Sequence, residues 1–241
     1  MPQLLFLPGL ACDHVMWQHQ LAALATAPFS AFFTALKPAV TDVHTRFDRL
    51  EAMAAALLAE HEGELILCGA SMGGMLAMEV ARQSPERVKG LALLGTSARP
   101  ESPQMRQLRE GAIVFFEQGR AEEVLKFNLP MAFHKNRASD TKLTQTYIDF
   151  VLQAGAAQLI SQNRAVMARP DARLHLPRLR CPTLVLCGDC DQLAPPECSE
   201  EIAALIPGAE FKTIEQCGHM LTMERPAEVN TALALWLRRV V

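Results

Sequence analysis

The stretch CGASMGG (residues 68–74) decides the fold, because it places Ser71 where an apolar run ends and a helix-like run begins. Residues 65–67 before it are aliphatic, and residues 75–80 after it carry apolar side chains at helical spacing. A nucleophile on a sharp strand-to-helix turn has a strained backbone, so its neighbours must be small, as the glycines and alanine are here. A Gly-x-Ser-x-Gly pattern alone arises easily by chance. Its position between a strand and a helix makes a nucleophilic serine the better interpretation.

The rest of the chain alternates short apolar runs with helix-periodic segments. Further strands are predicted at residues 4–7, 31–35, 90–94, 183–187 and 210–214, and helices at 48–60, 199–205 and 226–237. Strands that are apolar on both faces and separated by helices are typical of a parallel sheet covered on both sides. We therefore expect an α/β fold with about six mostly parallel strands. Because the first predicted strand starts at residue 4, no N-terminal hairpin is expected.

One long stretch interrupts this alternation. Between about residues 99 and 173 the sequence shows helix-like segments, at 105–118, 121–127 and 143–169, and no convincing buried strand. No internal repeat and no Gly/Ser-rich linker marks a separate second domain. The predicted organisation is an α/β core made of residues 1–98 and 174–241, with a helical insertion at 99–173.

Composition narrows the possible partners and compartments. Of 241 residues, 50% are hydrophobic and 20% are charged, which is ordinary for a globular protein. A net charge of -3 gives no reason to expect nucleic acid or an anionic membrane as partner. No apolar stretch approaches the length of a membrane span, and the N-terminal residues lack the features of a signal peptide. Seven cysteines without a disulfide-like spacing favour a cytoplasmic location.

A serine hydroxyl is a poor nucleophile without a base and an acid to orient that base. His219 lies in a loop between the predicted strand 210–214 and the last helix, so we expect it at the carboxyl edge of the sheet. The acid should come from another loop at that edge. The loop after strand 183–187 offers two candidates, Asp189 and Asp191.

The chain resembles the α/β-hydrolases in segments spread over its whole length. These are LPGL (7–10), GASMGG (69–74), PTLVLCGDCD (182–191), and GH (218–219) with ERP (224–226). In that family the acid is the last residue of a Gly-x-x-Asp segment, which implies Asp191 rather than Asp189. The family's order of nucleophile, acid and base is kept by Ser71, Asp191 and His219.

The resemblance also implies an oxyanion hole made of two backbone donors. One is the N–H of Met72, the residue after the nucleophile. The other is the N–H of Leu10, in the loop after the first strand. Relatives usually have His-Gly there, whereas this chain has Pro8-Gly9. Proline lacks its own N–H but leaves the Leu10 donor intact.

The predicted insertion at 99–173 occupies the position of the helical lid that covers the pocket in the family. Candidate pocket residues, for each of which core packing is the alternative, are Trp17, Met75, Phe115, Phe116, Leu129, Phe133, Leu193 and Met220. No cluster of Arg or Lys is evidently aimed at a substrate carboxylate. The expected substrate is therefore a small molecule with an uncharged acyl group, and neither metal nor cofactor is needed. The expected assembly is a monomer or homodimer.

Several readings of the site remain open. The first is a carboxylesterase for small to medium apolar esters, with polyesters and lactones among the candidates. The second is a C–C bond hydrolase or a cofactor-free lyase or synthase with the same three residues. A third, from another class, is a ligand receptor with slow turnover. Cys187 and Cys190 form a C-x-x-C, so a redox or metal site is a rival hypothesis.

Overall fold

The computed structural model describes residues 1–26 and 30–241. Six strands form one sheet in the order β2-β1-β3-β4-β5-β6, and every adjacent pair is parallel. The strands are β1 (Gln3–Leu7), β2 (Ala39–Val40), β3 (Leu65–Ala70), β4 (Val88–Leu94), β5 (Thr183–Gly188) and β6 (Glu210–Ile214). The α-helices are α1 (Gln18–Leu24), α2 (Ser30–Ala35), α3 (Leu50–Glu60), α4 (Met72–Gln83), α5 (Pro103–Glu117), α6 (Ala121–Ala132), α7 (Thr141–Met167), α8 (Pro196–Leu205), α9 (Leu221–Glu224) and α10 (Pro226–Val240). Short 3-10 helices lie at η1 (His14–Trp17), η2 (Val43–Thr45), η3 (Pro85–Arg87), η4 (Ala172–Leu174) and η5 (Leu176–Arg178).

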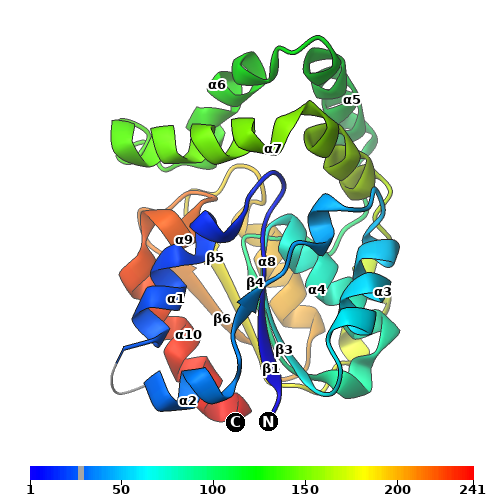
Figure 1. Cartoon of the computed structure of the whole chain (residues 1–241), viewed down its shortest axis with the longest axis vertical. Helices are drawn as coiled ribbons and strands as arrows, with labels where there is room; N and C mark the ends of the chain where they lie inside the picture. Colours follow the sequence, from blue (N-terminus) through cyan, green and yellow to red (C-terminus); the bar gives the residue numbers. More distant parts are fainter. Residues whose placement is uncertain (27–29) are drawn as a thin grey trace.

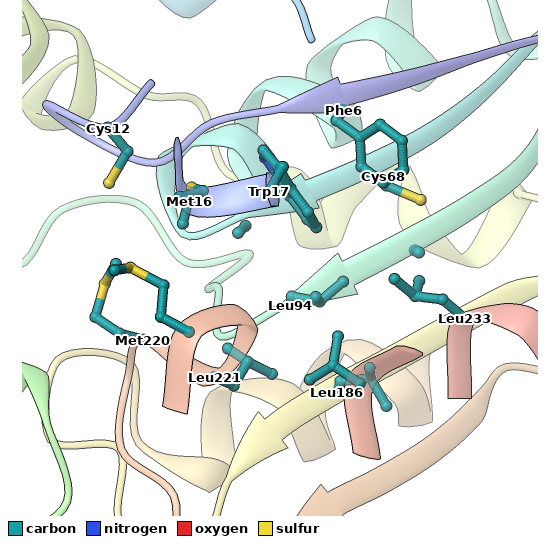
Figure 2. Close-up of a cluster of buried hydrophobic side chains, with 14 of the residues drawn as sticks. Phe6, Cys12, Met16, Trp17, Cys68, Leu94, Leu186, Met220, Leu221 and Leu233 are labelled. Atoms are coloured by element: carbon teal, nitrogen blue, oxygen red, sulfur yellow. The ribbon is translucent and has the colours of Figure 1, made fainter. Parts of the chain in front are cut away.

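The four inner strands of the sheet are buried on both faces, and their alternate residues join two separate cores. In β1, Leu4 and Phe6 join the cluster beneath α1, α9 and α10, whereas Leu5 and Leu7 join the cluster beneath α3, α4 and α8. Figure 2 shows the first cluster, in which Trp17 stacks beside Phe6 with ring centroids 4.9 Å apart. This alternation is what a parallel sheet with helices on both sides requires. The prediction of an α/β sheet of six parallel strands is confirmed.

The second strand in the chain was predicted in the wrong place. Residues 31–35 were expected to form a strand, but they belong to helix α2, and the strand follows at β2 (Ala39–Val40). Only two of its residues pair with β1, Ala39 with Leu5 and Val40 with Phe6. A two-residue strand after Lys37-Pro38 has no alternation for a pattern search to detect.

A helical segment stands between β4 and β5. Helices α5, α6 and α7 lie together at one end of the sheet, and β1 rises from the N-terminus toward α7 (Figure 1). The carboxyl ends of the parallel strands therefore face this segment. Among the described residues, no helix combines the length and apolar character that crossing a membrane would require.

Candidate functional site

The turn that carries Ser71 joins the end of β3 to the start of α4. Ser71 has φ 54° and ψ -119°, a left-handed conformation that side-chain-bearing residues rarely adopt. The turn is crowded by neighbouring backbone. A Cβ on Gly69 would lie 2.3 Å from the carbonyl oxygen of Gly73, and one on Gly73 would lie 2.0 Å from that of Leu7. The prediction that the serine's neighbours must be small is thus confirmed.

Three side chains from distant parts of the chain form one row of hydrogen bonds. The Nε2 atom of His219 lies 2.9 Å from the Oγ of Ser71. The other ring nitrogen, Nδ1, lies 2.8 Å from Oδ2 and 3.0 Å from Oδ1 of Asp191. His219 and Asp191 are almost fully buried, whereas Ser71 is partly exposed. A hydroxyl that small molecules can reach is therefore backed by a sheltered imidazole and carboxylate.

The two aspartates after β5 have different surroundings. Besides facing His219, Asp191 accepts hydrogen bonds from the N–H groups of Leu193 and Ala194, both at 2.9 Å, through its Oδ1. Asp189 instead accepts from the backbone N–H groups of Gln216 and Cys217, at 2.9 and 3.0 Å. It braces the loop that leads to His219 without touching the imidazole.

Charges around the imidazole decide its protonation. Burial by itself would lower the pKa of His219. The negative charge of Asp191 and its hydrogen bond to the ring raise the pKa, and the charge of Glu224 raises it further, whereas Arg109 lowers it. Together these effects leave the pKa of His219 above its ordinary value. The surroundings therefore stabilise the protonated form of the His219 ring more than water stabilises that of a free histidine.

The loop after β1 lies directly against the serine. A Cβ on Gly9 would stand 3.3 Å from the Cβ of Ser71, so the backbone at Gly9 passes close to the serine turn. No acceptor in the described part of the chain takes the N–H of Leu10. Met72 is the first residue of α4, so its N–H has no acceptor one turn earlier. Both predicted donors are thus free at the edge of the site.

The geometry agrees with what the chain resembles. A family model described as "Alpha/beta hydrolase family" matches residues 4–232. The chain belongs to this family. An esterase from Thermogutta terrifontis, solved with malate bound, is 29% identical and superposes with a TM-score of 0.87 over 100% of this chain and 90% of that one.

Two further relatives of this hydrolase were found by sequence. RutD of Serratia proteamaculans, to which a carbamate hydrolase activity is ascribed, is 26% identical over 98% of this chain and 91% of its own length. The pimeloyl-[acyl-carrier protein] methyl ester esterase of Aromatoleum aromaticum is 27% identical over 74% of this chain and 76% of its own. The names of these relatives therefore refer to two kinds of bond, a carbamate and a carboxylic ester.

The predicted pocket residues fall into three groups. Five of them share one apolar cluster that runs from the sheet into the helical segment: Trp17, Phe116, Leu129, Phe133 and Met220. Trp17 is fully buried, so the structure gives it a packing role against Phe6. Met75 packs on the cluster at the opposite face of the sheet. Phe115 lies under the guanidinium of Arg120, 4.2 Å from ring centroid to Cζ, and Leu193 is 40% exposed.

Residues that sequence reasoning gave no role also support the site. Thr96 donates a 2.7 Å hydrogen bond to the carbonyl of Ser71 and so holds the turn. Gln162 of α7, fully buried, accepts a 2.6 Å hydrogen bond from the N–H of Ala11 in the loop beside Ser71. Tyr147 packs edge-on against both Phe133 and Phe150, with centroid distances of 5.4 Å. Of these residues, none carries a recognisable sequence signal, because their partners are backbone groups or distant rings.

The cysteines do not converge. Cys187 is buried at the end of β5, whereas Cys190 is exposed, and both are free thiols. Burial raises the pKa of Cys187, which disfavours the reactive thiolate. Within residues 1–26 and 30–241, no three His, Cys, Asp or Glu side chains gather as metal ligands would.

Proposed function

We propose that this member of the alpha/beta hydrolase family is a serine hydrolase that cleaves carboxylic esters with small to medium apolar acyl groups. The observation that carries the proposal is the continuous row Ser71–His219–Asp191, with donor–acceptor distances of 2.9 and 2.8 Å. These are the contacts that proton transfer from a serine to an oriented imidazole needs. The N–H groups of Leu10 and Met72, which no described acceptor takes, support the proposal as candidate donors to the oxyanion.

The reaction follows from these parts. His219 takes the proton of Ser71 as its Oγ attacks the ester carbonyl, and Asp191 stabilises the imidazolium that forms. The N–H groups of Leu10 and Met72 donate to the oxyanion of the tetrahedral intermediate. His219 then gives its proton to the leaving alkoxide, and an acyl group stays on Ser71. Water, deprotonated by the same imidazole, attacks this acyl-enzyme and releases the acid.

The helical segment formed by residues 99–173 acts as the lid of the pocket. It faces the carboxyl edge of the sheet (Figure 1). Ser71, Asp191 and His219 follow β3, β5 and β6 at that edge. Phe116, Leu129 and Phe133 from this segment share one apolar cluster with Met220, the neighbour of His219. The contact between the helical segment and the histidine loop is therefore apolar, which supports an uncharged acyl group. The esterases among the relatives support the same substrate class.

A labelling experiment tests the serine directly. A fluorophosphonate probe is added to the wild-type protein and to Ser71→Ala, and the modified peptide is mapped by mass spectrometry. We expect one adduct, on Ser71, and hydrolysis of p-nitrophenyl butyrate that the substitution reduces by about 10⁴-fold or more. Labelling of another serine, or equal turnover by both proteins, would refute the proposal.

A substrate panel then separates ester cleavage from the alternatives. Short-chain esters, lactones, aryl carbamates and vinylogous diketones are compared by kcat/KM. We expect the apolar esters to have the highest kcat/KM. A protein that acylates once and then stalls on every substrate would instead be the slow-turnover receptor, and preference for the diketones would indicate C–C bond hydrolysis.

A further inference from the structure

A buried carboxylate, Glu224, lies next to the site without belonging to the Ser71–His219–Asp191 row. It ends the short helix α9 and is 3% exposed. Its Oε1 accepts hydrogen bonds from the N–H groups of Gly218, at 3.0 Å, and Met220, at 3.2 Å. These two residues flank His219. One carboxylate oxygen therefore holds the backbone on both sides of the imidazole-bearing residue.

The second oxygen of Glu224 reaches the helical segment. Oε2 accepts a 2.8 Å hydrogen bond from the N–H of His134, just beyond the end of α6. The same end of α6 contacts the histidine loop directly, since the carbonyl of Ala132 accepts from the N–H groups of His219, at 3.0 Å, and Met220, at 3.2 Å. Glu224 thus links the loop that carries the base to the lid.

The two backbones meet closely because residue 218 is a glycine. A Cβ on Gly218 would lie 2.6 Å from the backbone nitrogen of His134 and 2.7 Å from the carbonyl carbon of Phe133. No side chain fits between the histidine loop and the end of α6. A shift of α6 would therefore move His219 with it.

A buried carboxylate is costly unless its oxygens are hydrogen-bonded. Burial raises the pKa of Glu224, although its three backbone donors and His134 act the other way. The charge is also felt by the base, because Glu224 helps to raise the pKa of His219. The titratable or charged groups that act on the pair are Asp191, Arg109, His134 and the thiols of Cys190 and Cys217.

We propose that Glu224 is a positioning residue for His219, which clamps the histidine loop to the end of α6 so that the lid helps to set the imidazole against Ser71. The inference rests on the proposed hydrolase function. It assigns a mechanical task to the lid besides covering the pocket. Two of the clamp's three hydrogen bonds flank the base, and the third comes from the lid.

The first test replaces Glu224 by glutamine and uses Glu215→Gln, an exposed position in the loop between β6 and α9, as the matched control. Glutamine keeps the size but has one acceptor oxygen and no charge. We expect kcat to fall about 10- to 100-fold with KM changed less than about threefold, because the base is misplaced rather than the pocket. The acid limb of the kcat/KM profile should move to lower pH, because the charge of Glu224 helps to raise the pKa of His219. Unchanged kcat and an unmoved limb would overturn the inference.

The second test cuts the lid contact and leaves Glu224 in place. His134→Pro removes the backbone donor and sets the ring Cδ against Oε2 of Glu224, so it breaks the contact, while His134→Ala removes the side chain and keeps the donor. Phe133, which precedes it, has φ -122° and ψ 148°, a conformation compatible with a following proline. The proline variant should lose about tenfold or more in kcat relative to the alanine variant, with circular dichroism showing both folded. Equal kcat in the two variants would overturn the link through the lid.

A titration that needs no turnover separates this inference from the proposed function. The ring resonances of His219, assigned with His219→Asn, are followed by NMR across pH in wild type and Glu224→Gln. A lower pKa of His219 in the variant supports the clamp even for a protein that hydrolyses no ester. An unchanged pKa rejects it, whatever the fluorophosphonate experiment shows.

Discussion

Ser71 carries backbone strain that its surroundings enforce. Its φ of 54° belongs to a region that costs a side-chain-bearing residue about 1–3 kcal/mol. The N–H of Ser71 donates to the carbonyl of Leu94 at 2.9 Å, and its own carbonyl accepts from Thr96, Gly74 and Met75 at 2.7, 3.0 and 3.2 Å. Four hydrogen bonds thus hold one residue in an unfavourable conformation that presents its hydroxyl to the site.

This strain predicts a difference between two inactive variants. Ser71→Gly relieves the left-handed conformation, whereas Ser71→Ala keeps it. We expect the glycine variant to be about 1 kcal/mol more stable than the alanine variant in urea unfolding, even after the larger entropy of an unfolded glycine is counted. A glycine variant no more stable than alanine would mean that the turn is not strained in solution.

The imidazole makes a prediction about pH. His219 must be neutral to accept the serine proton, and its surroundings raise its pKa. Activity should therefore be full above that raised pKa and fall as the pH drops through it, with the acid limb above about 6.5. Asp191→Asn should move the limb to lower pH and reduce kcat by about 10³- to 10⁴-fold. The check is kcat/KM against pH for both proteins; a limb that stays in place in the variant would contradict the charge argument.

At the scale of elements, helix α4 sits on β1 without a side chain between them. The Cα of Gly73 faces the carbonyl of Leu7 so closely that a methyl group would overlap backbone atoms. This contact holds the serine turn and the loop that begins at Pro8 at a fixed separation. The separation between the Ser71 turn and the loop after β1 therefore depends on a glycine.

Gly73→Ala tests the contact. Because the clash is with backbone, α4 must move, and we expect a loss of about 3 kcal/mol or more in unfolding free energy together with a fall in kcat. Gly111→Ala is the matched control, since it lies in α5 with nothing within 4 Å of an added Cβ. The unfolding free energy of the control variant should rise by about 0.5–1 kcal/mol, because alanine favours a helix over glycine. Equal stability of the two variants would refute the close approach.

Most elements could be predicted from the sequence, and the exceptions have a physical reason. Four strands, β1, β3, β4 and β5, stand out because each contains a run of at least four apolar residues that are buried. β2 does not, because it is two residues long and depends on its neighbour β1 for its definition. Propensity says little about so short a segment, and tertiary pairing decides it.

At the scale of the whole molecule, the helical segment α5–α7 is hydrogen-bonded to loops on both sides of the site. Gln162 of α7 accepts from the N–H of Ala11 at 2.6 Å and donates to the carbonyl of His44 at 2.9 Å. On the opposite side, the end of α6 holds the loop of His219. The motifs predicted which three side chains would meet, and the structure brings them together. The motifs could not predict the hydrogen bonds of Gln162 and of the end of α6, because every residue has a backbone N–H or carbonyl and the sequence does not show which of them is bound.

Gln162→Leu tests the first of these contacts. It leaves the N–H of Ala11 and the carbonyl of His44 buried without partners, which costs about 1–3 kcal/mol. Because Ala11 follows Leu10, kcat should also fall, by about 10- to 100-fold. Gln153→Leu, at an exposed position on α7, is the control. Steady-state kinetics and thermal unfolding measure both effects; a loss of stability with unchanged kcat would limit Gln162 to a structural role.

The contacts of the helical segment bear on how such enzymes can be recombined. A lid that merely covered a pocket could be exchanged between relatives as an independent module to transfer specificity. Here the segment shares hydrogen bonds with Ala11 on one side and with His219 on the other. A chimera with a foreign lid should therefore need matching residues in both core loops before it recovers its turnover.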